Sequence, residues 1–127
     1  MINKEGWLIK AEKHKSPNFD QRPKNTDIKL IVIHNISLPP ENFEPENVKK
    51  FFMNELDFET HKFFQEIRGL KVSSHFVIDR IGKIYQFVSV YDRAWHAGVS
   101  SFNNQENCND FSLGVELIGS DNTPFED

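Results

Sequence analysis

Ile28-Lys29-Leu30-Ile31-Val32-Ile33 is a short, β-branched apolar run that ends at His34 and is bounded by turn-forming residues. A run of this kind is typical of a strand that is buried on both faces in a central sheet. The next residues, 35–40, include two prolines, each of which disfavours helix in the residue before it. We therefore expect His34 to lie where a strand gives way to a loop.

Further strands and helices are predicted on both sides of this run. Residues 74–79 and 84–90 have the pattern of two strands, and the Gly-containing turn at 80–83 between them predicts an antiparallel hairpin. Residues 112–118 alternate apolar side chains with small ones, and Glu116 interrupts the small face. Short helices are expected over 45–54 and 60–68, where a proline or a threonine precedes helical spacing of apolar residues.

The composition indicates one domain. The 127 residues include 16 aromatic side chains, 15 basic and 19 acidic residues, and the formal charge is −4. Residues 1–27 are polar and are interpreted as a loosely ordered N-terminal arm that leads into a domain over 28–127.

Several classes of protein are not expected from this composition. The single cysteine, Cys108, excludes a disulfide framework and a multi-cysteine zinc site. No apolar stretch resembles a signal peptide or a membrane span, and basic residues do not cluster as nucleic-acid binding requires. We expect a cytoplasmic protein without nucleic-acid or membrane partners; its oligomeric state is left open.

Candidate catalytic residues are a few histidines and one glutamate. His34 ends a predicted buried strand on the side where α/β proteins usually bind ligands, although a hydrogen-bonded structural histidine fits equally well. His75 and His96 could converge on it, or simply be packed. Glu116 is notable because a buried carboxylate persists only with a partner, a metal or a catalytic task; the alternative is a glutamate that reaches solvent. Trp95 and its small neighbours could form a sugar- or peptide-binding wall, or belong to the core.

Four segments, 32–40, 72–78, 93–100 and 108–117, together resemble the AmpD-type N-acetylmuramoyl-L-alanine amidases. This family is related to the amidase-type phage lysozymes and to the peptidoglycan recognition proteins. The resemblance implies an α/β fold with a central mixed β-sheet flanked by helices. It also implies a cytoplasmic zinc enzyme of cell-wall recycling that hydrolyses the amide between (1,6-anhydro-)N-acetylmuramic acid and L-alanine of a muropeptide.

The resemblance assigns roles to particular residues. His34 corresponds to the first zinc ligand, and Glu116 corresponds to the general base that takes a proton from water. Substrate binding is assigned to Asn35, Trp95 and His96. His75 is expected to support the site without touching the metal.

The family completes its zinc site with a second histidine and an aspartate, which are expected beyond Asp127 after a long helix. We therefore expect either that the C-terminal part of the domain is missing from this sequence or that the chain is a short form without amidase activity. The alternative function is a metal-free muropeptide-binding or sensing module. Without the helix, one face of the sheet is expected to expose apolar surface.

Overall fold

A computed structural model of the chain describes residues 1–125. Its elements, in chain order, are β1 (Glu12–Lys13), β2 (Phe19–Gln21), β3 (Leu30–Ile36), α1 (Glu46–Phe52), the 3₁₀ helix η1 (Lys62–Ile67), β4 (Phe76–Ile78), β5 (Ile84–Gln86), β6 (Asp92–Ala94), β7 (Ser101–Phe102), β8 (Gln105–Glu106), the 3₁₀ helix η2 (Cys108–Phe111) and β9 (Ser112–Ile118). None of the helices among these residues is long and apolar enough to cross a bilayer.

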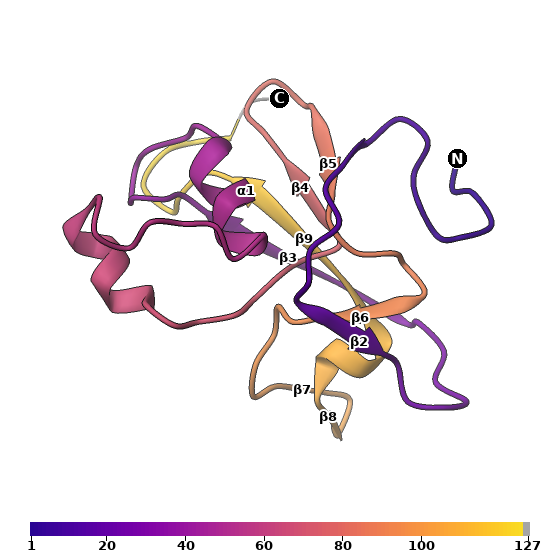
Figure 1. The fold of residues 1–127 in the computed structure, drawn as a ribbon. Helices are drawn as coiled ribbons and strands as arrows, with labels where there is room; N and C mark the ends of the chain where they lie inside the picture. The colour runs from indigo at the N-terminus through magenta and orange to yellow at the C-terminus, as the bar shows by residue number, and fades with distance from the viewer. Residues whose placement is uncertain (126–127) are drawn as a thin grey trace.

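Five strands form one mixed sheet in the order β1-β5-β4-β9-β3 (Figure 1). β4 and β5 are antiparallel and form the predicted hairpin, whereas β9 runs parallel to both β4 and β3. The expected mixed sheet is therefore confirmed. Two smaller ladders pair β2 with β6 and β7 with β8.

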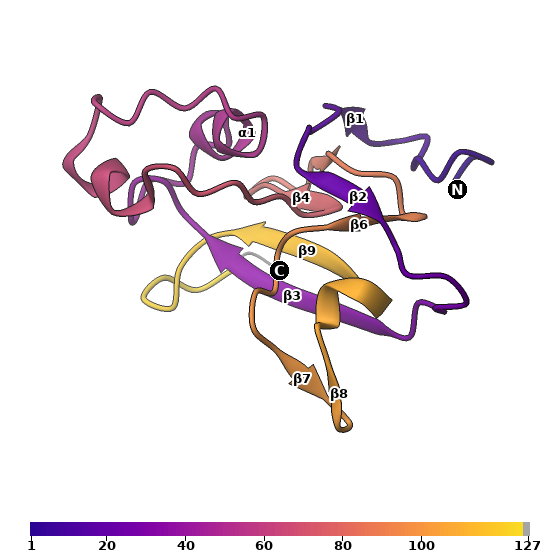
Figure 2. The same cartoon turned by 60° about the horizontal axis from the view of Figure 1, so that its bottom comes forward.

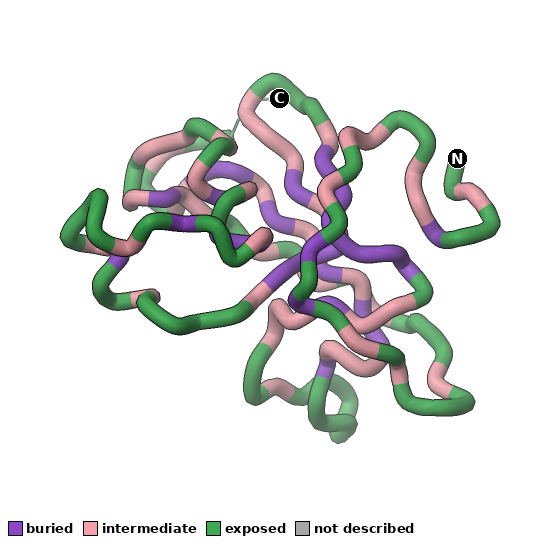
Figure 3. Tube along the Cα trace, viewed as in Figure 1, coloured by how far each residue is buried: buried purple, intermediate pink, exposed green. Residues whose placement is uncertain are grey.

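The hydrophobic core lies between α1 and one face of the sheet. The helix predicted over 45–54 is present as α1, which begins directly after Pro45, ends at Phe52 and buries Val48, Phe51 and Phe52. These side chains pack with Val77 and other residues from the inward face of the sheet. Figure 3 shows the buried positions gathered along the central strands, with the connecting loops exposed.

β3 differs from the expectation of a strand buried on both faces. It starts at Leu30, continues to Ile36 and pairs only with β9, so it is an edge strand and His34 lies within it. Ile31 and Ile33 are 61% and 64% exposed. Figure 2 shows α1 over one face of the sheet, and the face that carries these isoleucines has no such cover among the described residues. The apolar run predicted the strand correctly, but a pattern within one strand cannot show which face a distant element covers.

The N-terminal residues belong to the fold and do not form a loosely ordered arm. β1 adds a parallel strand next to β5, and β2 pairs with β6. Between them, the buried Ser16 and Asn18 donate hydrogen bonds to the carbonyl of Phe52 at the end of α1. Polar composition alone predicted a loose segment because it does not reveal these distant partners.

The helix expected over 60–68 is instead the 3₁₀ helix η1. His61, rather than Thr60, caps it, and its Nδ1 accepts the N–H of Phe63 at 3.0 Å. Gly69 follows η1 with φ +80°, in the left-handed region that glycine adopts without strain.

Candidate functional site

His34 and Glu116 lie side by side on the inward face of the sheet. The parallel register pairs His34 on β3 with Glu116 on β9. Because side chains alternate along a strand, the small face predicted for 112–118 points inward, and Glu116 is only 8% exposed. The two residues that the sequence singled out are therefore brought together by strand pairing.

Glu116 is a buried carboxyl group with an unsatisfied oxygen. Its Oε2 has no hydrogen-bond partner among the described residues, and burial raises the pKa of the carboxyl to about 8. A buried carboxylate without a partner is costly, and a positive charge close to it would lower its pKa again. The position suits a carboxyl group that takes up and releases a proton beside a cation.

His34 is hydrogen-bonded through one nitrogen only. Its Nε2 lies 3.1 Å from Nδ1 of His96, and Nε2 of His96 lies 3.1 Å from Oγ of Ser112. Burial lowers the pKa of His34, and burial with His34 close by lowers the pKa of His96 to about 3. Both rings are therefore neutral at pH 7. Nδ1 of His34 makes no hydrogen bond within residues 1–125.

His75 is separated from His34 by the ring of His96. It is fully buried, and its Nδ1 accepts the N–H of Gly114 at 3.0 Å, so Nε2 carries the proton that is donated to the carbonyl of Asp92 at 2.8 Å. Burial, offset in part by the Asp92 hydrogen bond, lowers its pKa to about 4. The ring centroids of His75 and His96 are 6.3 Å apart. His75 thus holds backbone segments together behind the site.

Trp95 and Asn35 point away from this group. The indole Nε1 of Trp95 donates to Oδ1 of Asp20 at 3.3 Å, in a carboxylate that Arg93 also holds. Asn35 follows His34 on β3, so its side chain is on the opposite face, where its Nδ2 donates to Oδ1 of Asp121 at 2.7 Å.

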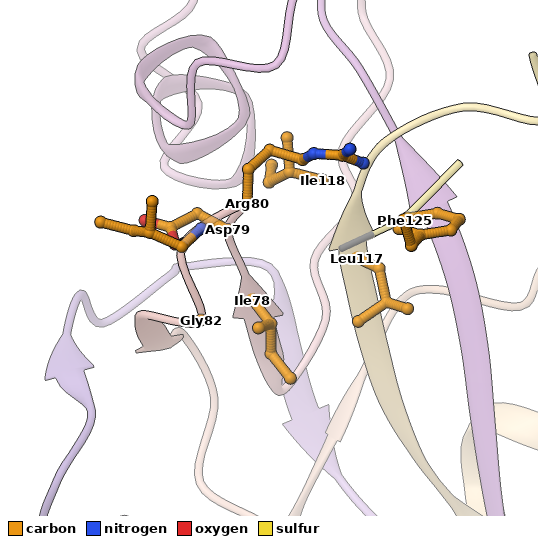
Figure 4. Close-up of a pocket in the computed structure, with 8 residues that line it drawn as sticks. Ile78, Asp79, Arg80, Gly82, Leu117, Ile118 and Phe125 are labelled. Carbon is orange, nitrogen blue, oxygen red and sulfur yellow. The ribbon is translucent and has the colours of Figure 1, made fainter. Parts of the chain in front are cut away.

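Two hollows flank the sheet. A groove of about 410 Å³ runs along β3 and is lined by His34 together with Ala97, Ser100 and Phe102 from the loop that carries β7. A larger cavity of about 540 Å³ lies between the β4–β5 turn and the end of β9, lined by Arg80, Leu117 and Phe125 (Figure 4). The larger cavity includes neither His34 nor Glu116, so the groove along β3 is the better candidate for substrate.

The described residues supply one candidate metal ligand and do not complete a metal centre. Within residues 1–125, no three His, Cys, Asp or Glu side chains are grouped so that they could hold an ion. A catalytic zinc site uses three protein ligands. The open Nδ1 of His34 and the orphaned Oε2 of Glu116 fit one ligand and a neighbouring acid–base group.

The sequence-based reasoning missed two residues that shape this site. Gly114 lies under the ring of His96, and Asn109 accepts the backbone N–H groups of His96 and Ala97 at Oδ1. A signal for the first was present, since a strand face with Ser112 and Gly114 leaves room for a ring from another segment. The sequence pattern could not show that the ring of His96, 16 residues before Ser112, packs on this face.

Comparison with known proteins gives consistent matches. The family model described as N-acetylmuramoyl-L-alanine amidase matches residues 24–127. The 1,6-anhydro-N-acetylmuramyl-L-alanine amidase AmpD of Haemophilus influenzae is 51% identical over 122 residues, which are 96% of this chain and 66% of that protein. Its Escherichia coli counterpart is 45% identical over 127 residues, which are 100% of this chain and 69% of that protein.

A solved structure shares the fold. The crystal structure of a selenomethionine derivative of AmpD superposes with a TM-score of 0.96 at 45% identity, covering 100% of this chain and 71% of that one. The chain thus spans about two thirds of the length of the curated relatives that it matches.

Proposed function

Because the chain belongs to the N-acetylmuramoyl-L-alanine amidase family, we propose that its protein hydrolyses the amide between 1,6-anhydro-N-acetylmuramic acid and L-alanine in muropeptides. The observation that carries the proposal is the pairing of His34 with a buried, partner-free Glu116 on adjacent parallel strands. The named activity of the relatives supplies the substrate class. The reaction belongs to recycling of wall fragments in the cytoplasm, a setting compatible with the free thiol of Cys108.

Each residue has a defined task in this reaction. Glu116 accepts a proton from the water that attacks the amide carbon, and it returns a proton to the leaving amino group of L-alanine as the C–N bond breaks. His34 presents Nδ1 as an open donor atom beside it. The groove along β3 has room for part of the sugar or the peptide.

His34 is the residue in this chain that would bind zinc. A zinc ion held by His34 and two further ligands supplies a Lewis acid for the carbonyl group and lowers the pKa of water. It would also be the cation that returns the pKa of Glu116 to a range in which the carboxylate can act as a base.

The test is Glu116→Gln in the protein expressed from its complete reading frame and loaded with zinc. We expect the rate of L-alanyl peptide release from anhydromuropeptide to fall about 100- to 10,000-fold, because the amide cannot accept a proton. Glu106→Gln, at an exposed position on β8, is the matched control and should leave the rate unchanged. An unchanged rate for Glu116→Gln, or no hydrolysis by the wild type, contradicts the proposal.

A metal-free muropeptide-binding or sensing module is the second candidate function. It is favoured by the single candidate ligand among the described residues. Metal analysis after dialysis, combined with calorimetric titration of anhydromuropeptide, separates the two candidates. Binding of intact muropeptide without metal supports the module, and tight stoichiometric zinc contradicts it.

A further inference from the structure

His34, His96 and Ser112 form a chain of hydrogen-bonding groups on the inward face of the sheet. The two links are 3.1 Å each, from Nε2 of His34 to Nδ1 of His96 and from Nε2 of His96 to Oγ of Ser112. The ring planes of the two histidines are inclined at 70°, with centroids 5.3 Å apart. His34 and Ser112 are thus connected through both nitrogens of a single imidazole.

The position of His96 is defined by several independent contacts. Its ring lies directly on Gly114, where an added Cβ would be 2.6 Å from Cγ and Cδ2 of the imidazole. Oδ1 of Asn109 accepts its backbone N–H at 3.1 Å and that of Ala97 at 2.9 Å. Because Asn109 holds the backbone of His96 and the ring packs directly on Gly114, the imidazole has little freedom to turn toward a substrate.

A hydrogen bond between two imidazole nitrogens requires that one carries the proton and the other offers a lone pair. If His34 donates from Nε2, its Nδ1 is unprotonated, and His96 then donates from its own Nε2 to Ser112. If the direction is reversed, Nδ1 of His34 carries a proton and cannot act as a donor atom to a metal. The direction of these two hydrogen bonds therefore decides whether Nδ1 of His34 is unprotonated, as a metal ligand must be.

We propose that His96 is a positioning residue. Its Nδ1 accepts a hydrogen bond from Nε2–H of His34, its own Nε2–H donates to Oγ of Ser112, and Nδ1 of His34 is thereby kept free as the ligand atom. The inference rests on the proposed function and assigns His96 a task different from substrate binding. Outer hydrogen-bond partners of this kind set the tautomer and the ring orientation of ligating histidines.

The first readout is spectroscopic and needs no turnover. In the protein expressed from its complete reading frame and labelled with ¹⁵N in histidine, we expect His34 to show a protonated Nε2, an unprotonated Nδ1 and a scalar coupling across the N–H···N bond to His96. A protonated Nδ1 on His34 in the zinc-loaded protein, or a coupling that starts from a protonated Nδ1 of His96, overturns the inference.

The second readout is the affinity for Zn²⁺ alone, measured by competition with a chelating dye. His96→Ala should weaken binding about 10- to 100-fold, the range typical of lost outer-shell partners. His96→Asn, whose carbonyl can accept the Nε2 proton, should recover part of this loss. Gly114→Ala adds a Cβ that would overlap the imidazole of His96 and displace it, so this variant should bind Zn²⁺ more weakly even though His96 is still present.

Controls separate positioning from general damage. His61→Asn removes an imidazole at the start of η1, far along the chain from this face, and should leave zinc affinity unchanged. Urea unfolding of each variant reports its stability. Full zinc affinity in a folded His96→Ala protein contradicts the inference. Hydrolysis by the wild type, assayed in parallel, tests the proposed function separately, because an active enzyme with the opposite tautomer would refute only the role of His96.

Discussion

Glu116 and His75 are both buried titratable groups, but their hydrogen bonding differs. Glu116 has an oxygen without a partner among the described residues, as expected of a group that exchanges protons. Both nitrogens of His75 are satisfied by backbone groups, and Nη2 of Arg22 lies 3.3 Å from its Nε2. We therefore expect His75 to contribute to stability, whereas the partner-free oxygen of Glu116 is consistent with the acid–base role proposed for it.

His75 should make the fold sensitive to acid. Its pKa is about 4 in the fold, against about 6.5 in an unfolded chain. The unfolded state therefore binds more protons between these values, and stability is lost as the pH falls from about 6.5 to about 4, by up to about 3 kcal/mol. The free energy of unfolding in urea, measured at several pH values, should show this slope.

His75→Gln provides the comparison for that slope. We expect a less stable protein at pH 7, because the amide replaces the ring imperfectly, but a smaller loss between pH 6.5 and pH 4. An equal loss in the variant and the wild type would mean that other groups, such as His96, account for the acid sensitivity.

At the level of elements, the N-terminal segment secures the end of α1. The amide of Asn18 donates to the carbonyls of Phe52 and Val72 and to Oδ1 of Asn54, whose own amide donates back to it. One buried side chain therefore joins the segment between β1 and β2 to the end of α1 and to the loop that precedes β4.

Asn18→Ala should lower the free energy of unfolding by about 2–3 kcal/mol, because buried carbonyl groups lose their donors. Urea denaturation measures the change, and Lys15→Ala, an exposed position three residues earlier, is the control. A loss below about 0.5 kcal/mol would indicate that water replaces the amide at this junction.

At the scale of the whole molecule, the two faces of the sheet differ in how far other elements cover them. One face packs on α1 and carries the site, whereas the other exposes Ile31 and Ile33 on the edge strand β3. An edge strand with apolar side chains offers both unpaired backbone groups and hydrophobic surface to a second chain. The expectation of an exposed apolar face, made from the sequence, agrees with this arrangement.

The 127-residue chain should consequently self-associate in a concentration-dependent manner. Replacing both isoleucines by threonine keeps β propensity, removes apolar surface and should shift the sedimentation profile toward the monomer. A wild-type chain that stays monomeric up to about 100 μM and unfolds cooperatively would contradict this expectation.

Local pattern was enough to predict several elements of this protein. The alternation over 112–118 predicted β9 with its correct bounds, the Gly-containing turn predicted the β4–β5 hairpin, and Pro45 marked the start of α1. The motifs around His34 and Glu116 were sufficient to identify the family. These features depend on residues within a few positions of one another, where side-chain periodicity and backbone preference act directly.

The remaining features depend on contacts between distant segments. The sequence placed His34 at a strand end and grouped Asn35 with it, but pairing with β9 extends the strand and turns Asn35 to the other face. Likewise, His96 lies 62 residues from His34 along the chain, and the two rings meet because Gly114 leaves room for the imidazole and Asn109 holds its backbone. Strand order, register and the room left by one glycine are properties of the assembled sheet, which is why only the tertiary structure could decide them.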